Sequence, residues 1–96
     1  MNLLLIIFDA SLEERVLDSL RRIGVPGYSL VRDLTGFGRT GRREGDPIWP
    51  GTNSMLMVVV PEGVMDSVRE MLSRLKQEYT RPPALHVFSL DATEIL

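Results

Sequence analysis

The sequence contains no cysteine, a single histidine and a single tryptophan among its 96 residues. Without cysteine there is no disulfide, no thiolate metal site and no cysteine nucleophile, which fits a cytoplasmic protein better than a secreted one. The histidine, His86, has no second histidine or acidic residue at ligand spacing. The sequence therefore predicts neither a metal held by protein ligands nor a general base built on imidazole.

The chain also lacks an excess of positive charge and a long apolar run. It has 11 Lys+Arg against 13 Asp+Glu, a formal net charge of −2, whereas a dedicated nucleic-acid binder needs a net basic surface. The longest apolar run, Leu3 to Phe8, is far shorter than the roughly 20 residues of a membrane helix. It also has no signal-peptide flanks. We expect a cytoplasmic protein that binds no nucleic acid and does not insert into a membrane.

Candidate catalytic groups are equally scarce. The serines have only His86 as a possible base, and no G-x-S-x-G nucleophile motif occurs. Three acids, Asp9, Glu13 and Glu14, lie at the first strand-to-helix junction, where carboxylates stabilise a helix N-terminus without any catalytic role. The sequence therefore indicates a protein that is not an enzyme.

What the sequence does contain is a regular succession of apolar strand and helix patterns. Hydrophobic residues make up 44% and charged residues 25%, as in one small globular domain. Ser11 and Glu14 form a capping box that predicts the start of the first helix, and Gly24 marks its end. Periodicity predicts strands over 2–8, 28–35, 53–60 and 85–90, and helices over 11–24 and 64–79.

The order β-α-β, long loop, β-α-β predicts the fold class α+β, with a ferredoxin-like arrangement over residues 1–96. Such a fold has a four-stranded antiparallel sheet with two helices on one face. Because the strands are apolar on both sides, we also expect the open face of the sheet to be covered by other copies of the chain.

Residues 36–51 form the one long segment without apolar periodicity, and the sequence predicts an exposed loop there. The loop carries five glycines and three arginines, which suit a phosphate cradle of backbone N–H groups and guanidinium groups. A solvated turn whose arginines pair with Glu44 and Asp46 is the alternative. Trp49 is either a packing anchor at the loop base or a stacking platform for a base.

Five short stretches resemble a known family. They are Leu3-Leu4-Leu5-Ile6-Ile7, Gly24-Val25-Pro26-Gly27-Tyr28, Gly36-Phe37-Gly38-Arg39, Trp49-Pro50-Gly51 and Val58-Val59-Val60-Pro61-Glu62. Together they resemble the PII nitrogen-regulatory signal proteins, and more closely the divergent PII-like relatives that have a shortened loop. The Gly-Phe-Gly-Arg tetrapeptide directly after the second strand is the most specific piece.

The resemblance implies a non-enzymatic homotrimer with nucleotide sites in the clefts between subunits. The implied ligand is an adenine nucleotide such as ATP, ADP or AMP, or a similar small anion. The implied partner is a transporter or metabolic enzyme regulated through the 36–51 loop. The resemblance assigns ligand binding to the following residues: Gly36, Phe37, Gly38, Arg39, Thr40 and Gly41, with Arg81 as the substitute for the phosphate loop of classical relatives.

The chain departs from the classical relatives at several of these places. Thr40 replaces the glutamine that holds magnesium-bound 2-oxoglutarate, and Asn53 replaces a lysine. The loop has no tyrosine to be modified, and Tyr79 to Ala84 replace a glycine-rich phosphate loop. Three alternatives stay open: a trimeric PII-fold interaction protein that has lost nucleotide binding, an amino-acid-binding regulatory module of the same strand order, and a small hydrolase.

Overall fold

The computed structural model describes residues 1–38, 41–43 and 52–96. Its four long strands and two α-helices follow one another in the order that the sequence predicts, and a 3₁₀ turn and two short strands are added to them. In chain order they are β1 (Asn2–Asp9), η1 (Ala10–Leu12), α1 (Glu13–Ile23), β2 (Ser29–Leu34), β3 (Gly36–Gly38), β4 (Gly41–Arg43), β5 (Asn53–Val60), α2 (Glu62–Gln77) and β6 (Leu85–Asp91).

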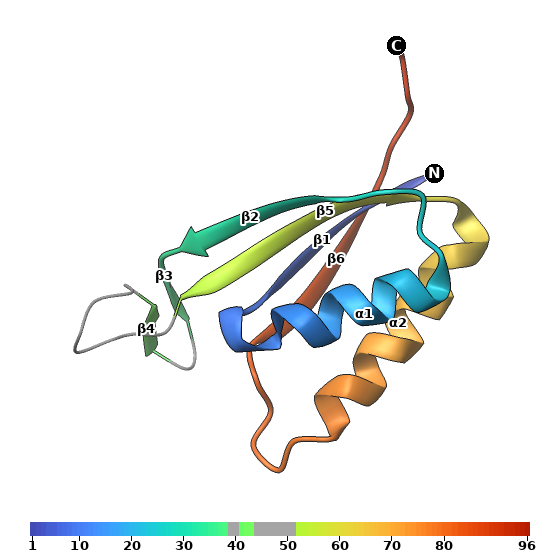
Figure 1. Ribbon diagram of the computed structural model, residues 1–96. Helices are drawn as coiled ribbons and strands as arrows, with labels where there is room; N and C mark the ends of the chain where they lie inside the picture. Colours follow the sequence, from blue (N-terminus) through green and yellow to red (C-terminus); the bar gives the residue numbers. More distant parts are fainter. Residues whose placement is uncertain (39–40, 44–51) are drawn as a thin grey trace.

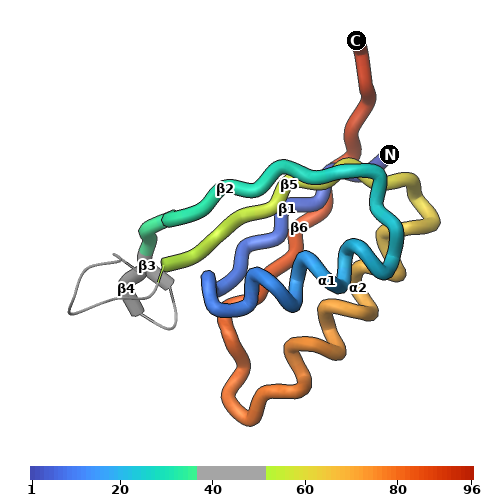
Figure 2. The backbone as a smooth tube through the Cα atoms, viewed as in Figure 1, coloured from blue at the N-terminus to red at the C-terminus, as the bar shows by residue number. Residues whose placement is uncertain are grey.

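Four of the strands form one antiparallel sheet in the order β2-β5-β1-β6. Both α-helices lie against one face of this sheet (Figure 1), and this confirms the predicted ferredoxin-like α+β fold. The start of β1 and the end of β6 lie side by side at one end of the sheet (Figure 2), where the Ala92 N–H donates to the Met1 carbonyl at 2.9 Å. The η1 turn and the connections from β2 to β5 and from α2 to β6 lie at the opposite end of the sheet.

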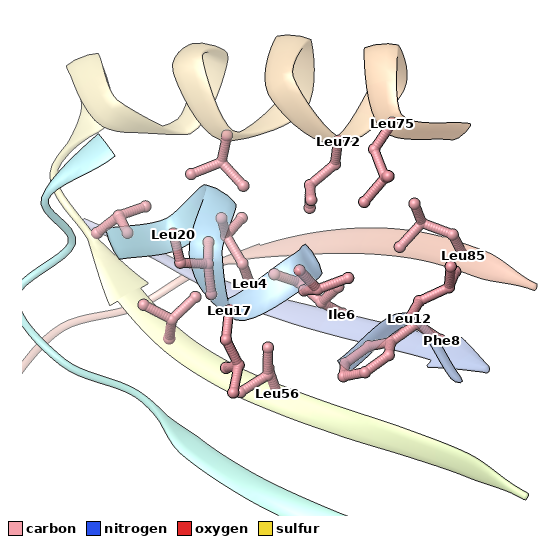
Figure 3. Packing of buried hydrophobic residues seen from close by; sticks show 14 residues of the cluster. Leu4, Ile6, Phe8, Leu12, Leu17, Leu20, Leu56, Leu72, Leu75 and Leu85 are labelled. Atoms are coloured by element: carbon pink, nitrogen blue, oxygen red, sulfur yellow. The ribbon is translucent and has the colours of Figure 1, made fainter. Parts of the chain in front are cut away.

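The core lies between the helices and the sheet (Figure 3). Alternate residues of β1 point toward the helices, and Ile6 and Phe8 have no exposed surface. The even positions of β5 lie on the same face, because β1 and β5 pair residue by residue in the antiparallel register. Val16 and Leu20 of α1 close the core from above.

Ile6 gives a direct test of this core. Ile6→Ala is expected to lower the free energy of unfolding by about 2–5 kcal/mol, because it leaves a cavity in a close-packed site. Ile95→Ala is the matched control, since Ile95 is 92% exposed and its loss is expected to change stability by less than about 0.5 kcal/mol. Urea unfolding of both variants at one protein concentration measures the difference, and equal losses would contradict this description of the core.

The start of the first helix differs from the predicted capping box. The Asp9 side chain accepts the Ser11 N–H at 2.9 Å and the Ser11 hydroxyl at 2.7 Å, and a 3₁₀ turn precedes α1. Ser11 therefore donates to the cap instead of being the cap, because the strand delivers Asp9 two residues earlier in the extended conformation that a capping residue needs. The end of α1 is as predicted, with Gly24 in the left-handed region at φ 83°.

The expectation of an irregular loop over 36–51 is wrong for its first part. Gly36–Gly38 and Gly41–Arg43 pair as the antiparallel strands β3 and β4. A register shift in β2 between Val31 and Leu34, with Asp33 at φ 60°, directs the chain into this hairpin. The hairpin forms a separate two-stranded sheet, so it carries no apolar pattern from which it could be predicted.

The face of the sheet that the helices leave uncovered is apolar. Pairing places Val31, Met55, Ile7 and His86 in one row across this face, and Ser29, Met57, Leu5 and Phe88 in the next. A third row holds Val59, Leu3 and Leu90. Phe88 is 55% and Leu90 50% exposed. An apolar surface of this kind is typical of a protein interface.

Candidate functional site

The candidate site lies at the end of the sheet where β1 and β2 end and β5 and β6 begin. Two backbone hydrogen bonds hold the connecting segments to each other there: Asp9 N–H donates to the Ala84 carbonyl and Ala10 N–H donates to the Thr52 carbonyl, both at 2.9 Å. The register also pairs Asn53 with Asp9 on one side and with Leu34 on the other. This end therefore gathers the η1 turn, the base of the β3–β4 hairpin and the connection between α2 and β6.

The structure places most of the predicted ligand residues in the hairpin. Gly36, Phe37 and Gly38 form β3, and Gly41 begins β4 opposite Gly38. Arg39 and Thr40 lie outside the described residues, as do Trp49 and the acids of the predicted loop. Gly36 is exposed, and a Cβ added there would meet nothing within 4 Å. Packing within one chain, as far as the structure describes it, therefore does not require a glycine at this position.

Asn53 is a polar residue of this end that the sequence did not single out as a binding group. Its Oδ1 is buried and has no hydrogen-bond partner among the described residues, and the same holds for the Ser54 hydroxyl beside it. A buried polar atom without a partner costs free energy, so Asn53 is a candidate to receive a donor from a ligand. Ser54 is 1% exposed and lies on the core face of β5, so it is not a candidate. The sequence feature that could have indicated this site is the pair of polar residues at the start of an otherwise apolar strand.

Arg81 lies in the connection between α2 and β6, on the opposite edge of the sheet from the hairpin. Its side chain is exposed and makes no ion pair or hydrogen bond within the described part of the chain. The ends of the connection are tied to neighbouring elements, because Lys76 Nζ donates to the Leu85 carbonyl at 3.0 Å and the Ala84 carbonyl accepts from β1. Arg81 therefore has no charged partner among the described residues, and the connection that carries it is held in place at its end by hydrogen bonds to α2 and β1.

Comparison with known proteins decides the family. The sequence model described as "Nitrogen regulatory protein P-II" matches residues 1–95. The chain belongs to the PII family. No curated protein matches the chain. The PII assignment agrees with the fold and with the glycine-rich hairpin after β2.

Solved structures of PII-like proteins are similar to most of the chain. CPII from Thiomonas intermedia K12, a nitrogen regulatory PII-like protein bound to ADP, AMP and bicarbonate, is 26% identical, with 93% of this chain and 86% of that chain covered and a TM-score of 0.70. CPII bound to ADP and bicarbonate is 27% identical over the same shares, also with a TM-score of 0.70. A PII-like signaling protein from Thermus thermophilus is 27% identical, with 93% and 83% covered and a TM-score of 0.63.

The histidine and the acids of this PII-family chain form no metal site within the described residues. His86 is exposed on the open face of β6, paired with Ile7. Among the described residues, no three His, Asp or Glu side chains lie close enough to share a metal ion. Glu13 is held by the Arg32 guanidinium through two hydrogen bonds of 2.8 Å. Asp9 and Glu13, at the first strand-to-helix junction, therefore have structural roles.

No described helix of the chain is both long and apolar enough to span a membrane.

The Glu13–Arg32 pair gives a pH-dependent contribution to stability. The hydrogen bonds from Arg32 hold the pKa of the Glu13 carboxyl below its ordinary value of 4.5. Because the folded state binds this proton less readily than the unfolded state, the contribution is present above pH 4.5 and is lost as the pH falls through the lowered value. Glu13→Gln is expected to reduce the loss of thermal stability between about pH 5 and about pH 3, and an unchanged pH profile would contradict this assignment.

Proposed function

We propose that this PII-family chain is a non-enzymatic, cytoplasmic signal-transduction protein. In this proposal it forms a homotrimer, binds an adenine nucleotide or a similar small anion in the clefts between subunits, and regulates a transporter or metabolic enzyme through residues 36–51. The family match over residues 1–95 carries the proposal. The similarity to CPII bound to ADP, AMP and bicarbonate supports the ligand class.

The apolar open face of the sheet supports the trimer. Its three rows present exposed Val59, Phe88 and Leu90 beside the partly buried apolar residues of β1. Helices cover only the other face, so copies of the same chain are the simplest cover for a surface that would otherwise favour aggregation. Packing these faces together would place the loop-bearing ends of different subunits next to one another.

The hairpin supports the ligand site. Gly36, Gly38 and Gly41 bring backbone without side chains to this segment, and Arg39 supplies a guanidinium for a phosphate oxygen. Asn53 and Arg81 lie at the same end of the sheet. Contacts between a ligand and this hairpin would couple occupancy to the surface that residues 36–51 present to a partner, which is the local switch that we propose.

One observation favours a second candidate function. The connection from Glu78 to Ala84 has two prolines and no glycine, so it lacks the backbone freedom of a phosphate-binding loop. A trimeric interaction protein of the same fold that has lost nucleotide binding would need no such loop. Membership of the PII family favours these two functions over an amino-acid-binding module of the same strand order.

A thermal-shift panel separates the two functions. The ligands are ATP, ADP, AMP, cyclic nucleotides, 2-oxoglutarate and bicarbonate, each with and without Mg²⁺. A ligand at about 100 times its Kd stabilises the folded state by about 2.7 kcal/mol, which raises the melting temperature of a small domain by several degrees. A rise specific to adenine nucleotides supports the sensor, and a flat panel supports the interaction protein.

A further inference from the structure

The connection between α2 and β6 contains an acidic residue, Glu78, as well as the predicted ligand residue Arg81. This inference rests on the proposed nucleotide site, in which Arg81 contacts a phosphate of the ligand. Glu78 lies three residues before Arg81 in the same short connection. A free carboxylate three residues away would attract the guanidinium and repel a phosphate, so a group that neutralises Glu78 keeps Arg81 available to a ligand.

Arg15 of α1 is that group in the structure. Its guanidinium forms an ion pair with the Glu78 carboxylate, and it donates to the Tyr79 hydroxyl at 3.2 Å. It also lies 5.9 Å from the centre of the Tyr79 ring. One side chain of α1 therefore holds the first two residues after α2. The bond to Glu78, followed by the bond to Tyr79, raises the pKa of Arg15, and an arginine guanidinium stays charged in proteins.

The contacts fix the connection at both ends. Arg15 holds Glu78 and Tyr79 at its start, and the Asp9 N–H holds the Ala84 carbonyl at its end. Between these anchors Arg81 is exposed and makes no hydrogen bond or ion pair within the described residues. Arg15 and Glu78 themselves are about half exposed, at 47% and 54%. An ion pair with this exposure contributes little to the free energy of folding. Stability alone therefore does not explain the contact between Arg15 and Glu78.

We propose that Arg15 is a positioning residue for anion binding by Arg81. It neutralises Glu78 and keeps that carboxylate turned toward α1, so that the guanidinium of Arg81 stays unpaired and meets the phosphate of an adenine nucleotide. Arg15 does not touch the ligand in this arrangement.

The test is the affinity for ADP, measured by isothermal titration of the full chain and its variants. Arg81→Ala is expected to weaken ADP binding about tenfold or more, as for the loss of a charge-assisted hydrogen bond. Arg15→Ala is expected to weaken it by about three- to tenfold, because Glu78 then competes for Arg81. The double variant Arg15→Ala with Glu78→Gln is expected to recover an affinity within about twofold of the original protein.

Two further variants exclude a general structural effect. Arg22→Ala is the matched control, because Arg22 is another exposed α1 arginine whose partner, Asp18 at 3.1 Å, belongs to the same helix. It is expected to leave ADP affinity unchanged. Adding Arg15→Ala to Arg81→Ala is expected to cause no further loss, since the two residues act through one contact.

The outcomes separate this inference from the proposed function. If the unmodified chain does not bind ADP, both are overturned. If ADP binds and Arg81→Ala weakens binding, but Arg15→Ala does not, only the role of Arg15 is overturned. A loss in Arg15→Ala that Glu78→Gln does not restore, or that adds fully to the loss in Arg81→Ala, also overturns it, because Arg15 would then act independently of the carboxylate and of Arg81.

Discussion

Phe88→Lys is expected to convert the protein from a trimer into folded monomers. Phe88 lies in the middle row of the open sheet face, directly opposite Leu5, and is 55% exposed in a single chain. In the proposed trimer this side chain is buried against other copies. A lysine at the same place would bring an ammonium group into an apolar interface without a partner, which costs several kcal/mol for each subunit.

The folded monomer is expected to survive this change. Phe88 points away from the core, which lies on the helix-covered face, so the substitution removes no core contact within the chain. Light scattering after gel filtration measures the mass, and circular dichroism checks the fold. Gln77→Lys on the exposed surface of α2 is the control that adds the same charge and leaves the mass unchanged. A Phe88→Lys variant that stays trimeric, or an unmodified chain that is monomeric, would contradict the proposed interface.

Arg39→Ala is expected to weaken ADP binding by up to about 100-fold, because a hydrogen bond between two charged groups contributes more than one between neutral groups. The resemblance to the PII proteins assigns this residue to the phosphate, and it follows Gly38 at the end of β3. If Arg39 serves the ligand and not the fold, the mass of the particle and its melting temperature without ligand are expected to stay unchanged.

Arg39→Lys tests the geometry of the same contact. Lysine keeps the charge but has no planar fork for two parallel hydrogen bonds to a phosphate, so an intermediate loss is expected. Arg69→Ala is the control, because Arg69 lies on the surface of α2 and pairs with Asp66 at 3.4 Å. The assignment of Arg39 to the site would be wrong if its alanine variant bound ADP as tightly as this control.

The main sheet and the helices could be predicted because they bury one face. Residues alternate in β1 and recur at helical spacing in α1 and α2 because the apolar side of each element packs on the same core. The β3–β4 hairpin could not be predicted in this way, because its six described residues include three glycines and two arginines and so carry no apolar alternation. Its presence was signalled only by the motif that resembles the PII proteins.

The candidate site could be predicted only where neighbours in sequence act together. Gly36 to Gly41 form a motif that is visible in the sequence, and Arg81 could be chosen because it is the basic residue of its connection. The contact between Arg15 and Glu78 joins residues 63 positions apart, so no local pattern contains it. Asn53 was noted only as a missing lysine, and its buried Oδ1 became apparent from the packing at the start of β5. Both the contact between Arg15 and Glu78 and the burial of Asn53 Oδ1 depend on residues that are far apart in the sequence, so they can be seen only in the folded chain.

The most direct test of the account is the binding of ADP to the purified, unmodified protein, measured by isothermal titration together with the mass of the particle by light scattering. The account predicts saturable binding of one ADP for each chain to a particle of three chains. An absence of saturable binding at millimolar ADP, by a particle that is nevertheless trimeric, would contradict it and leave an interaction protein of the PII family without a nucleotide.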